Sequence, residues 1–284
     1  MNLWFTEEFG IVGGLRAQVK ITRTLHSEKT DFQQIDIYET ADFGRMLVLD
    51  GIIMCTEFDE FSYHEMITHV PLMAHANPEK VLVIGGGDGG TIRDAIKHPT
   101  VKEVHLCEID RRVVDTCMEH IPSMAGKLND PKVHLHYEDG ARWVKDRPGT
   151  YDIIIVDSTD PIGPGKVLFE EPFYAACRGS LREGGILANQ AENFLLHTSL
   201  VGELLSFGKK LFPIPEYYYT LVPTYPGGMI GFTFFSTKSR PLDSFEEKAK
   251  KPGYEFVNSL RYWSPEMHRA AFVLPASIQK KIKA

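Results

Sequence analysis

The sequence predicts an α/β protein in which a Rossmann-like, doubly wound sheet follows a small N-terminal antiparallel β domain. Short stretches of strand-like sequence, separated by turn residues, occupy the chain as far as residue 56. After Asn77-Pro78 the pattern changes to a strand followed by a helix, repeated several times. Strands that alternate with helices are typical of a parallel sheet covered on both faces. We therefore predict a β domain over residues 1–62 and a Rossmann-like domain over residues 63–284.

Four strands and one helix are expected before the change of pattern. The strands lie at residues 18–26, 32–39, 45–49 and 52–56. The turns between them lie at residues 27–29, 42–44 and 50–51, the last an Asp-Gly pair that favours two-residue hairpins. A helix is expected from about residue 58 to residue 75. One apolar face at helical spacing consists of Tyr63, Met66, Ile67 and Val70.

Strands and helices then alternate as a parallel sheet requires. Strands are expected at residues 80–84, 103–107, 133–136, 151–156 and 185–189. Helices are expected at residues 91–98 and 111–120. The run at 153–156 is apolar on both faces, as a central parallel strand is. Two β-rich stretches near the end of the chain, at 217–222 and 230–237, are expected to form an antiparallel edge.

Composition excludes several functional classes. The 284 residues include 38 acidic and 31 basic side chains, for a formal net charge of -7. This acidic balance argues against a nucleic-acid-binding surface and leaves cationic ligands open. There is no run of about 18 apolar residues to cross a membrane, and the N-terminus lacks the features of a secretory signal. The four cysteines form no CxxC pair, so we expect reduced thiols and a cytoplasmic protein.

A glycine-rich loop follows the first strand of the Rossmann-like part. Residues 85–90 satisfy the pattern GxGxxG through Gly85, Gly87 and Gly90. The pattern alone is weak evidence, but here it follows a predicted strand and opens a predicted helix. Glu108 ends the second strand 18 residues beyond Gly90, where an acidic residue binds ribose hydroxyls. These two features together predict a nucleoside site.

The charge of the loop indicates which nucleoside. A dinucleotide would place its pyrophosphate at the helix N-terminus, where Asp88 would repel it. A carboxylate there favours a cationic ligand, such as a sulfonium, and so an S-adenosylmethionine-type compound over NAD. Asp139-Gly140 follows the next strand, where the carboxylate could accept a hydrogen bond from an adenine amino group. An ordinary Asp-Gly turn explains that pair nearly as well.

A second acidic group ends the central strand. Asp157 and Asp160 are expected to face the same opening as Asp88, because ligands bind at the carboxyl ends of parallel strands. Three carboxylates around one cavity repel one another unless a cation is present. Turn chemistry explains Asp160 well and Asp157 poorly. We expect no metal, because the carboxylates have no histidine at ligand spacing and the two histidines of the HExxxH run at 64–69 point about 140° apart.

Several motifs in fixed order closely resemble those of spermidine synthases, over nearly the whole chain. The glycine loop, the segment around Glu108 and the sequence Asp157-Ser158-Thr159-Asp160-Pro161 carry most of the resemblance. Further matching segments lie at 49–51, 57–66, 223–226 and 262–275. The resemblance implies a class I methyltransferase-like variant of the Rossmann fold. It also implies that a homodimer or homotetramer assembles through the N-terminal strands.

The activity that the resemblance implies is aminopropyl transfer from decarboxylated S-adenosylmethionine to putrescine. The products would be spermidine and 5'-methylthioadenosine, and no metal or prosthetic group would be needed. The nucleoside would be held by Gln33, Gly85, Gly87, Asp88, Glu108, Ile109, Asp139, Gly140 and Pro164. The amines would be held by Tyr63, His64, Asp88, Asp157, Ser158, Thr159, Asp160, Gln190 and Tyr225. Residues 160–169 resemble a gatekeeping loop that orders over bound substrates.

The chemistry of amine attack assigns a base. A primary ammonium has a pKa of about 10.4, so the nucleophile arrives protonated and a positioned base must remove a proton. We take Asp157 as that base, with Tyr63 as a candidate relay. Asp88 would anchor the aminopropyl ammonium, and Asp160 or Glu192 would bind the far end of the diamine.

Two other functions fit the same fold. An S-adenosylmethionine-dependent methyltransferase would share it, but the carboxylate of that cofactor would meet repulsion from Asp88. A polyamine-binding protein without catalysis would leave the nucleoside site and the base without a purpose. The acceptor amine also stays open, because spermine, thermospermine and agmatine aminopropyltransferases share this core and differ in channel length.

Overall fold

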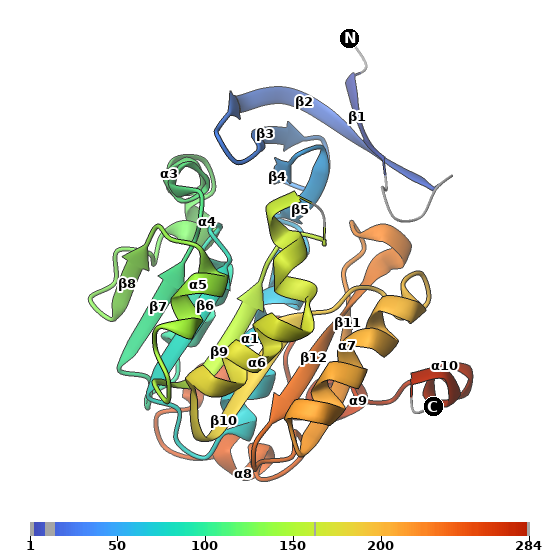
Figure 1. The fold of residues 1–284 in the computed structure, drawn as a ribbon. Helices are drawn as coiled ribbons and strands as arrows, with labels where there is room; N and C mark the ends of the chain where they lie inside the picture. Colours follow the sequence, from blue (N-terminus) through green and yellow to red (C-terminus); the bar gives the residue numbers. More distant parts are fainter. Residues whose placement is uncertain (1–2, 9–14, 162, 283–284) are drawn as a thin grey trace.

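The molecule consists of two β-sheets joined by a buried helix (Figure 1). A computed structural model describes residues 3–8, 15–161 and 163–282, without the side chains of Glu8 and Pro164. The N-terminal sheet has five strands in the order β1-β2-β3-β4-β5, and the main sheet has seven in the order β11-β12-β10-β9-β6-β7-β8. The predicted fold class is confirmed. No helix in the described part of the chain is both long and apolar enough to cross a bilayer.

The N-terminal sheet is antiparallel throughout. Its strands are β1 (Leu3–Glu8), β2 (Arg16–Lys29), β3 (Gln34–Thr40), β4 (Arg45–Leu49) and β5 (Ile52–Thr56). The Asp50-Gly51 turn is confirmed, with φ values of 48° and 82°, the left-handed conformation that a two-residue hairpin of this type requires.

The structure adds one strand to this sheet and contradicts one expected turn. β1 was not predicted, and the turn expected at residues 27–29 does not exist. There β2 continues, because Glu28 and Lys29 still pair with β3. The chain turns between Thr30 and Gln33, where the backbone N–H of Thr30 donates to the Gln33 carbonyl at 2.9 Å.

Helix α1 (Glu60–Ala74) lies between the two sheets and is buried on nearly all sides. Every residue of α1 except Phe61 is buried, including the charged Glu60, His64 and Glu65. The single apolar face expected from the sequence is therefore too narrow a description. Polar side chains inside a protein need partners, so these three residues mark positions where α1 makes specific contacts.

The main sheet is parallel except at one edge. Its strands are β6 (Lys80–Gly85), β7 (Glu103–Cys107), β8 (Val133–His136), β9 (Tyr151–Asp157), β10 (Leu181–Gln190), β11 (Ile214–Leu221) and β12 (Met229–Ser236). β12 pairs antiparallel with both β10 and β11, so the predicted antiparallel edge is confirmed. The strands β9, β6 and β7, which lead to Asp157, the glycine loop and Glu108, are consecutive in the sheet.

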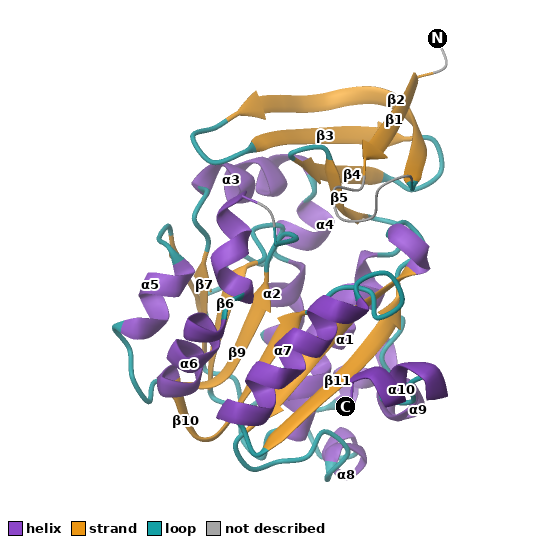
Figure 2. Ribbon diagram, turned by 45° about the vertical axis from the view of Figure 1, so that its right-hand side comes forward, coloured by secondary structure: helices purple, strands orange, loops and turns teal. Residues whose placement is uncertain are grey.

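Helices cover both faces of the main sheet (Figure 2). Besides α1, the helices of the molecule are α2 (Gly90–Ala95), α3 (Arg111–His120), α4 (Pro122–Ala125), α5 (Gly140–Lys145), α6 (Glu171–Ser180), α7 (Thr198–Leu211), α8 (Phe245–Ala249), α9 (Pro265–Ala270) and α10 (Ala276–Ile282), with short 3-10 helices η1 (Gly163–Phe169), η2 (Pro226–Gly228) and η3 (Glu255–Ser259), in the described part of the chain. α2 ends three residues earlier than the sequence indicated. α3 has the predicted bounds.

The alternation of side chains along the central strands creates two cores. Val81 and Val83 of β6 belong to the core that contains α1, whereas Leu82 and Ile84 belong to the core under α5, α6 and α7. Ile37 and its neighbours on the N-terminal sheet join the first of these cores. The two sheets therefore share one hydrophobic interior, which fixes the position of the N-terminal strands over the main sheet.

Because of this shared core, the two sheets should unfold together. Ile37 is fully buried, so Ile37→Ala should lower the free energy of unfolding by about 2–5 kcal/mol. The control Val273→Ala, at a side chain that is 67% exposed, should change it by less than about 0.5 kcal/mol. Urea unfolding followed by circular dichroism and tryptophan fluorescence measures both. Two separate transitions in the wild type would contradict a shared core.

Candidate active site

A cavity of about 370 Å³ lies between the carboxyl ends of the central strands and the N-terminal sheet. This volume is in the range of small-molecule sites. Every predicted site residue whose side chain is described lines this one cavity. They are Gln33, Tyr63, His64, Gly85, Gly87, Asp88, Glu108, Ile109, Asp139, Gly140, Asp157, Ser158, Thr159, Asp160, Gln190 and Tyr225. The side chain of Pro164 lies outside the described part, as does Ile162 of the expected gatekeeping loop.

The glycine loop brings the backbone close to the end of the central strand. Gly85 has a φ of +75°, and a Cβ atom there would lie 2.3 Å from the carbonyl oxygen of Asp157. Only glycine fits such a position. The loop therefore places Asp88, at the mouth of α2, on the same side of the cavity as Asp157.

One end of the cavity has the features expected for a nucleoside. Burial raises the pKa of Glu108 to about 7, and one oxygen of this carboxyl accepts from the backbone N–H of Asp110 at 3.0 Å. The side chain of Asp110 in turn accepts from Gln33 Nε2 at 3.2 Å. Asp110 therefore contacts both Glu108, predicted to bind the ribose, and Gln33, predicted to hold the nucleoside.

Asp139 has the local structural role expected of an Asp-Gly turn, and it also faces the cavity. Its Oδ1 atom caps α5 by accepting from the backbone N–H of Ala141 at 2.8 Å. Helix capping holds the carboxyl group at the cavity wall, where Asp139 and Gly140 both contribute to the lining. Turn chemistry and ligand contact are compatible at this position.

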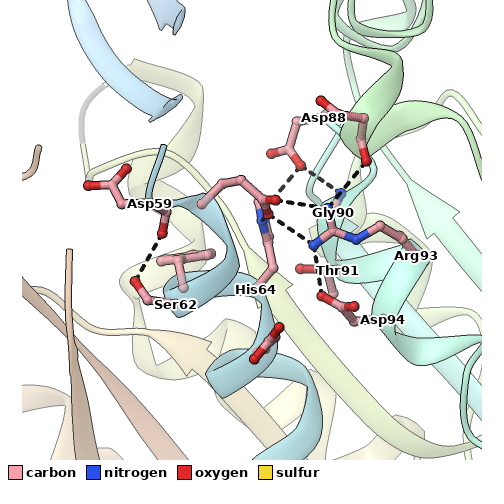
Figure 3. Close-up of polar contacts among 12 residues, drawn as sticks. Asp59, Ser62, His64, Asp88, Gly90, Thr91, Arg93 and Asp94 are labelled. Carbon is pink, nitrogen blue, oxygen red and sulfur yellow. Dashed lines mark hydrogen bonds and ion pairs between the residues drawn. The ribbon is translucent and has the colours of Figure 1, made fainter. Parts of the chain in front are cut away.

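A line of alternating charges enters the cavity from α1 and α2 (Figure 3). His64 lies between two carboxylates, with Nδ1 at 2.7 Å from Glu60 Oε2 and Nε2 at 3.2 Å from Asp88 Oδ1. Behind them, Arg93 contacts Glu60 at 2.9 Å and Asp94 at 3.0 Å. Burial alone would lower the pKa of His64, but Asp88 and Glu60 raise it well above its usual value.

The sequence argument that no histidine accompanies the carboxylates is wrong. His64, Asp88 and Asp157 place one potential ligand atom each within 4.8 Å of one another. The spacing within the HExxxH run shows only that His64 and His69 point apart. It says nothing about partners that other elements bring to His64. However, both ring nitrogens of His64 face carboxylates, and a protonated ring has no lone pair for a metal. The residues present therefore fit an imidazolium better than a metal ion.

Asp157 is held by two hydroxyl groups. Tyr63 donates to Oδ1 at 2.7 Å and Thr91 donates to Oδ2 at 2.6 Å. Burial and then the charge of Asp88 raise the pKa of Asp157, which His64 and the two hydroxyls lower only in part. Burial also raises the pKa of Tyr63 well above its usual value, so Tyr63 keeps its proton and acts as a donor. Thr91 was not identified from the sequence.

His64 thus gives the two aspartates of the cavity different properties. Burial would raise the pKa of Asp88 as well, but the adjacent imidazolium lowers it below its usual value. Asp88 is therefore a stable anion suited to bind an ammonium group. Asp157, whose pKa is raised, is the better proton acceptor of the two.

The far end of the cavity is acidic. Gln190 Nε2 donates to Glu192 at 3.2 Å, and His197 Nδ1 lies 3.1 Å from the same carboxylate. Burial opposes ionisation of Glu192, but His197 lowers its pKa. Burial and the neighbouring Glu192 raise the pKa of Asp160 well above its usual value. Such a group of carboxyls takes up protons unless a cationic ligand is present.

Glu7 is a lining residue that the sequence did not reveal. It is 1% exposed, and one oxygen accepts from the backbone N–H of Ile53 at 2.9 Å. Burial raises its pKa to about 7. The aromatic residues Trp4 and Phe5 favour a strand here, which was the available signal, but the pairing of β1 with β2 is a tertiary contact.

Backbone contacts fix the remaining wall. Glu192 has a φ of 63°, and its carbonyl accepts from Tyr217 Oη at 2.6 Å. Tyr225 donates to the carbonyl of Met54, and its ring lies 6.1 Å from that of Tyr63. The neighbouring Thr224 N–H donates at 2.9 Å to Asp59, just before α1. Strained backbone of this kind persists where surrounding contacts hold it, often at functional sites.

Comparison with known families agrees with this geometry. Residues 60–246 match the spermine/spermidine synthase domain, and residues 3–57 match the spermidine synthase tetramerisation domain. The chain belongs to the spermine/spermidine synthase family. The resemblance to spermidine synthases is confirmed, and so is the predicted class of enzyme, an aminopropyltransferase.

Similar proteins cover the chain from end to end. A polyamine aminopropyltransferase of Leptospira biflexa is 49% identical over 283 residues, covering 100% of this chain and 99% of the relative. One from Shouchella clausii is 45% identical, covering 100% of both chains. A spermidine synthase solved with the transition-state analogue AdoDATO has a TM-score of 0.94 at 37% identity, covering 99% of this chain and 95% of that one. The spermidine synthase of Thermotoga maritima has a TM-score of 0.92 at 37% identity, covering 99% and 94%.

The Thr91 hydroxyl should tune the acidity of Asp157. Thr91→Val removes a hydrogen bond to the ionised carboxylate, so the pKa of Asp157 should rise. With Asp157 as the expected general base, the acid limb of the pH–rate profile should then move to higher pH by about one unit, because a hydrogen bond to a charged group contributes about 1.5 kcal/mol. Thr91→Ser, which keeps the donor, should leave the limb near its wild-type position. An unmoved limb in Thr91→Val would show that this contact does not set the acidity.

Proposed function

We propose that the protein transfers the aminopropyl group of decarboxylated S-adenosylmethionine to putrescine, giving spermidine and 5'-methylthioadenosine. The observation that carries this proposal is the position of Asp88 and Asp157 between a nucleoside-like pocket and an acidic far end. A sulfonium nucleoside with a short aminopropyl chain fits one side, and a diamine fits the other. The reaction as proposed requires neither a metal nor a prosthetic group.

The reaction is one displacement at carbon with Asp157 as general base. Putrescine binds as an ammonium, and Asp157 takes one proton from the attacking nitrogen. This nitrogen forms a bond to the carbon next to the sulfonium, and the carbon–sulfur bond breaks. The electron pair of that bond returns to sulfur, so methylthioadenosine leaves as a neutral thioether. Alignment of the two substrates in one cavity can lower the barrier by several kcal/mol.

Charge determines where each amine binds. Asp88 carries the anion that would hold the aminopropyl ammonium, because His64 keeps its pKa low. Glu192, Asp160 and Glu7 would hold the distal ammonium of the diamine, which would in turn keep these carboxyls ionised. Tyr63, which donates to Asp157, and Gln190, which donates to Glu192, would position the diamine.

The proposal also covers the assembly and the location of the protein. The N-terminal domain over residues 1–62 would mediate a homodimer or homotetramer, in keeping with the tetramerisation domain that residues 3–57 resemble. A location in the cytoplasm fits the absence of a CxxC pair. A methyltransferase reading is disfavoured because the amino-acid carboxylate of S-adenosylmethionine would face Asp88.

Release of methylthioadenosine tests the proposed reaction. Decarboxylated S-adenosylmethionine should release it rapidly with putrescine and slowly with cadaverine, agmatine or spermidine. Asp157→Asn should reduce the rate by at least about a thousandfold, with nucleoside affinity nearly intact, because base and positioning are lost together. A preference for another amine would correct the acceptor. No release with any amine would contradict aminopropyl transfer.

Nucleoside binding should depend on the ionisation of Glu108. Ribose hydroxyls donate to the ionised carboxylate, and burial raises the pKa of the free group to about 7. Affinity for methylthioadenosine should therefore fall as the pH drops below about 7, approaching tenfold per pH unit. Calorimetry between pH 5.5 and 8.5 measures this. Glu108→Gln should bind more weakly with little pH dependence, and an unchanged slope would exclude Glu108 as the titrating group.

A further inference from the structure

Three side chains on β7 and β8 meet outside the active-site cavity. Glu103 and His105 are two residues apart on β7 and therefore share one face of the sheet. His134 is the direct partner of His105 on the neighbouring β8, and the two rings stack at 4.9 Å. Glu103 and His105 are partly buried, and His134 is exposed. Nothing in the proposed reaction uses these residues.

The donor atoms of this group fit a transition-metal ion. One ligand atom from each residue lies within 4.8 Å of the other two. His105 Nε2 lies 3.0 Å from Glu103 Oε2. Two ligands of a tetrahedral zinc ion are about 3.3 Å apart, given bond lengths of about 2.0 Å, and imidazole and carboxylate are both common zinc ligands.

A fourth side chain would orient His105 as a ligand. His105 Nδ1 lies 2.9 Å from His136 Nε2, and the two rings are nearly parallel, at 8°. When His105 donates its Nδ1 proton to His136, Nε2 carries the lone pair and points toward Glu103. Histidines that bind metals usually donate their other nitrogen in this way.

We propose that Glu103, His105 and His134 form a binding site for a zinc-like divalent cation, with His136 as the outer partner of His105. The exposed His134 leaves a path for the ion and room for water as a fourth ligand. Lys80 Nζ lies 3.3 Å from the same Glu103 oxygen, so the ion would replace this lysine contact. The bound ion would cross-link two adjacent strands, β7 and β8, that end near Glu108 and Asp139.

Zinc binding by the full chain tests the proposal. Titration with zinc chloride should give one more bound ion in the wild type than in His134→Gln, or a zinc affinity at least about tenfold higher. Loss of even an outer partner of a metal ligand usually lowers metal affinity by about tenfold or more. His120→Gln, a histidine on α3 outside the group, should behave as the wild type. Two controls separate this site from the group of His64, Asp88 and Asp157 in the cavity. Saturating methylthioadenosine occupies the cavity during the titration, and Asp157→Asn removes one possible ligand from that group.

The variants also define what overturns the proposal. His134 is exposed, so its replacement should leave the circular dichroism spectrum unchanged. Zinc should raise the unfolding temperature of the wild type and of His120→Gln more than that of His134→Gln. Absence of zinc binding in the wild type, equal binding by His134→Gln, or loss of the ion only in Asp157→Asn would each refute a site on β7 and β8. None of these results depends on whether the protein transfers an aminopropyl group.

Discussion

The contact of His64 with Glu60 and Asp88 is the interaction on which the account of the site depends. A buried imidazolium between two carboxylates is stable only when both are ionised and close, as they are here at 2.7 and 3.2 Å. It keeps Asp88 anionic in an interior that would otherwise favour the neutral acid. Asp157, whose hydrogen-bond donors among the described residues are the hydroxyls of Tyr63 and Thr91, keeps a raised pKa. One cavity thereby holds, side by side, a carboxylate whose lowered pKa suits it to bind an ammonium group and one whose raised pKa suits it to accept a proton.

The fold provides this interaction through α1. The helix is buried between the two sheets, so its side chains can reach the glycine loop on one side and the β11–β12 connection on the other. Arg93 extends the charged line to α2 and prevents an excess of negative charge around Glu60. Positions in the shared core, such as Ile37, keep the N-terminal strands over the cavity. The charged contacts of the cavity and the shared hydrophobic core therefore depend on the same helix.

Much of the fold follows from local sequence, because strongly periodic strands and a glycine loop in a strand–helix context need little else. The carboxylates at strand ends, such as Asp157, could be placed together because parallel strands share one edge. Features that depend on contacts between distant segments could not. Glu7 enters the cavity through pairing of β1, and His64 meets Asp88 through packing of α1 on α2. Thr91 has no motif of its own, since its role is a hydrogen bond from α2 to the end of β9.

The protonation state of His64 tests this account most directly. Nuclear magnetic resonance of the enzyme labelled with ¹⁵N-histidine, with His64→Gln for assignment, reports whether each ring nitrogen carries a proton. The account predicts that His64 is protonated at both nitrogens at pH 7.5 and shows no titration near pH 6.5, the usual value for histidine. A neutral ring at pH 7.5 would contradict it, because Asp88 and Asp157 would then have no basis for different roles.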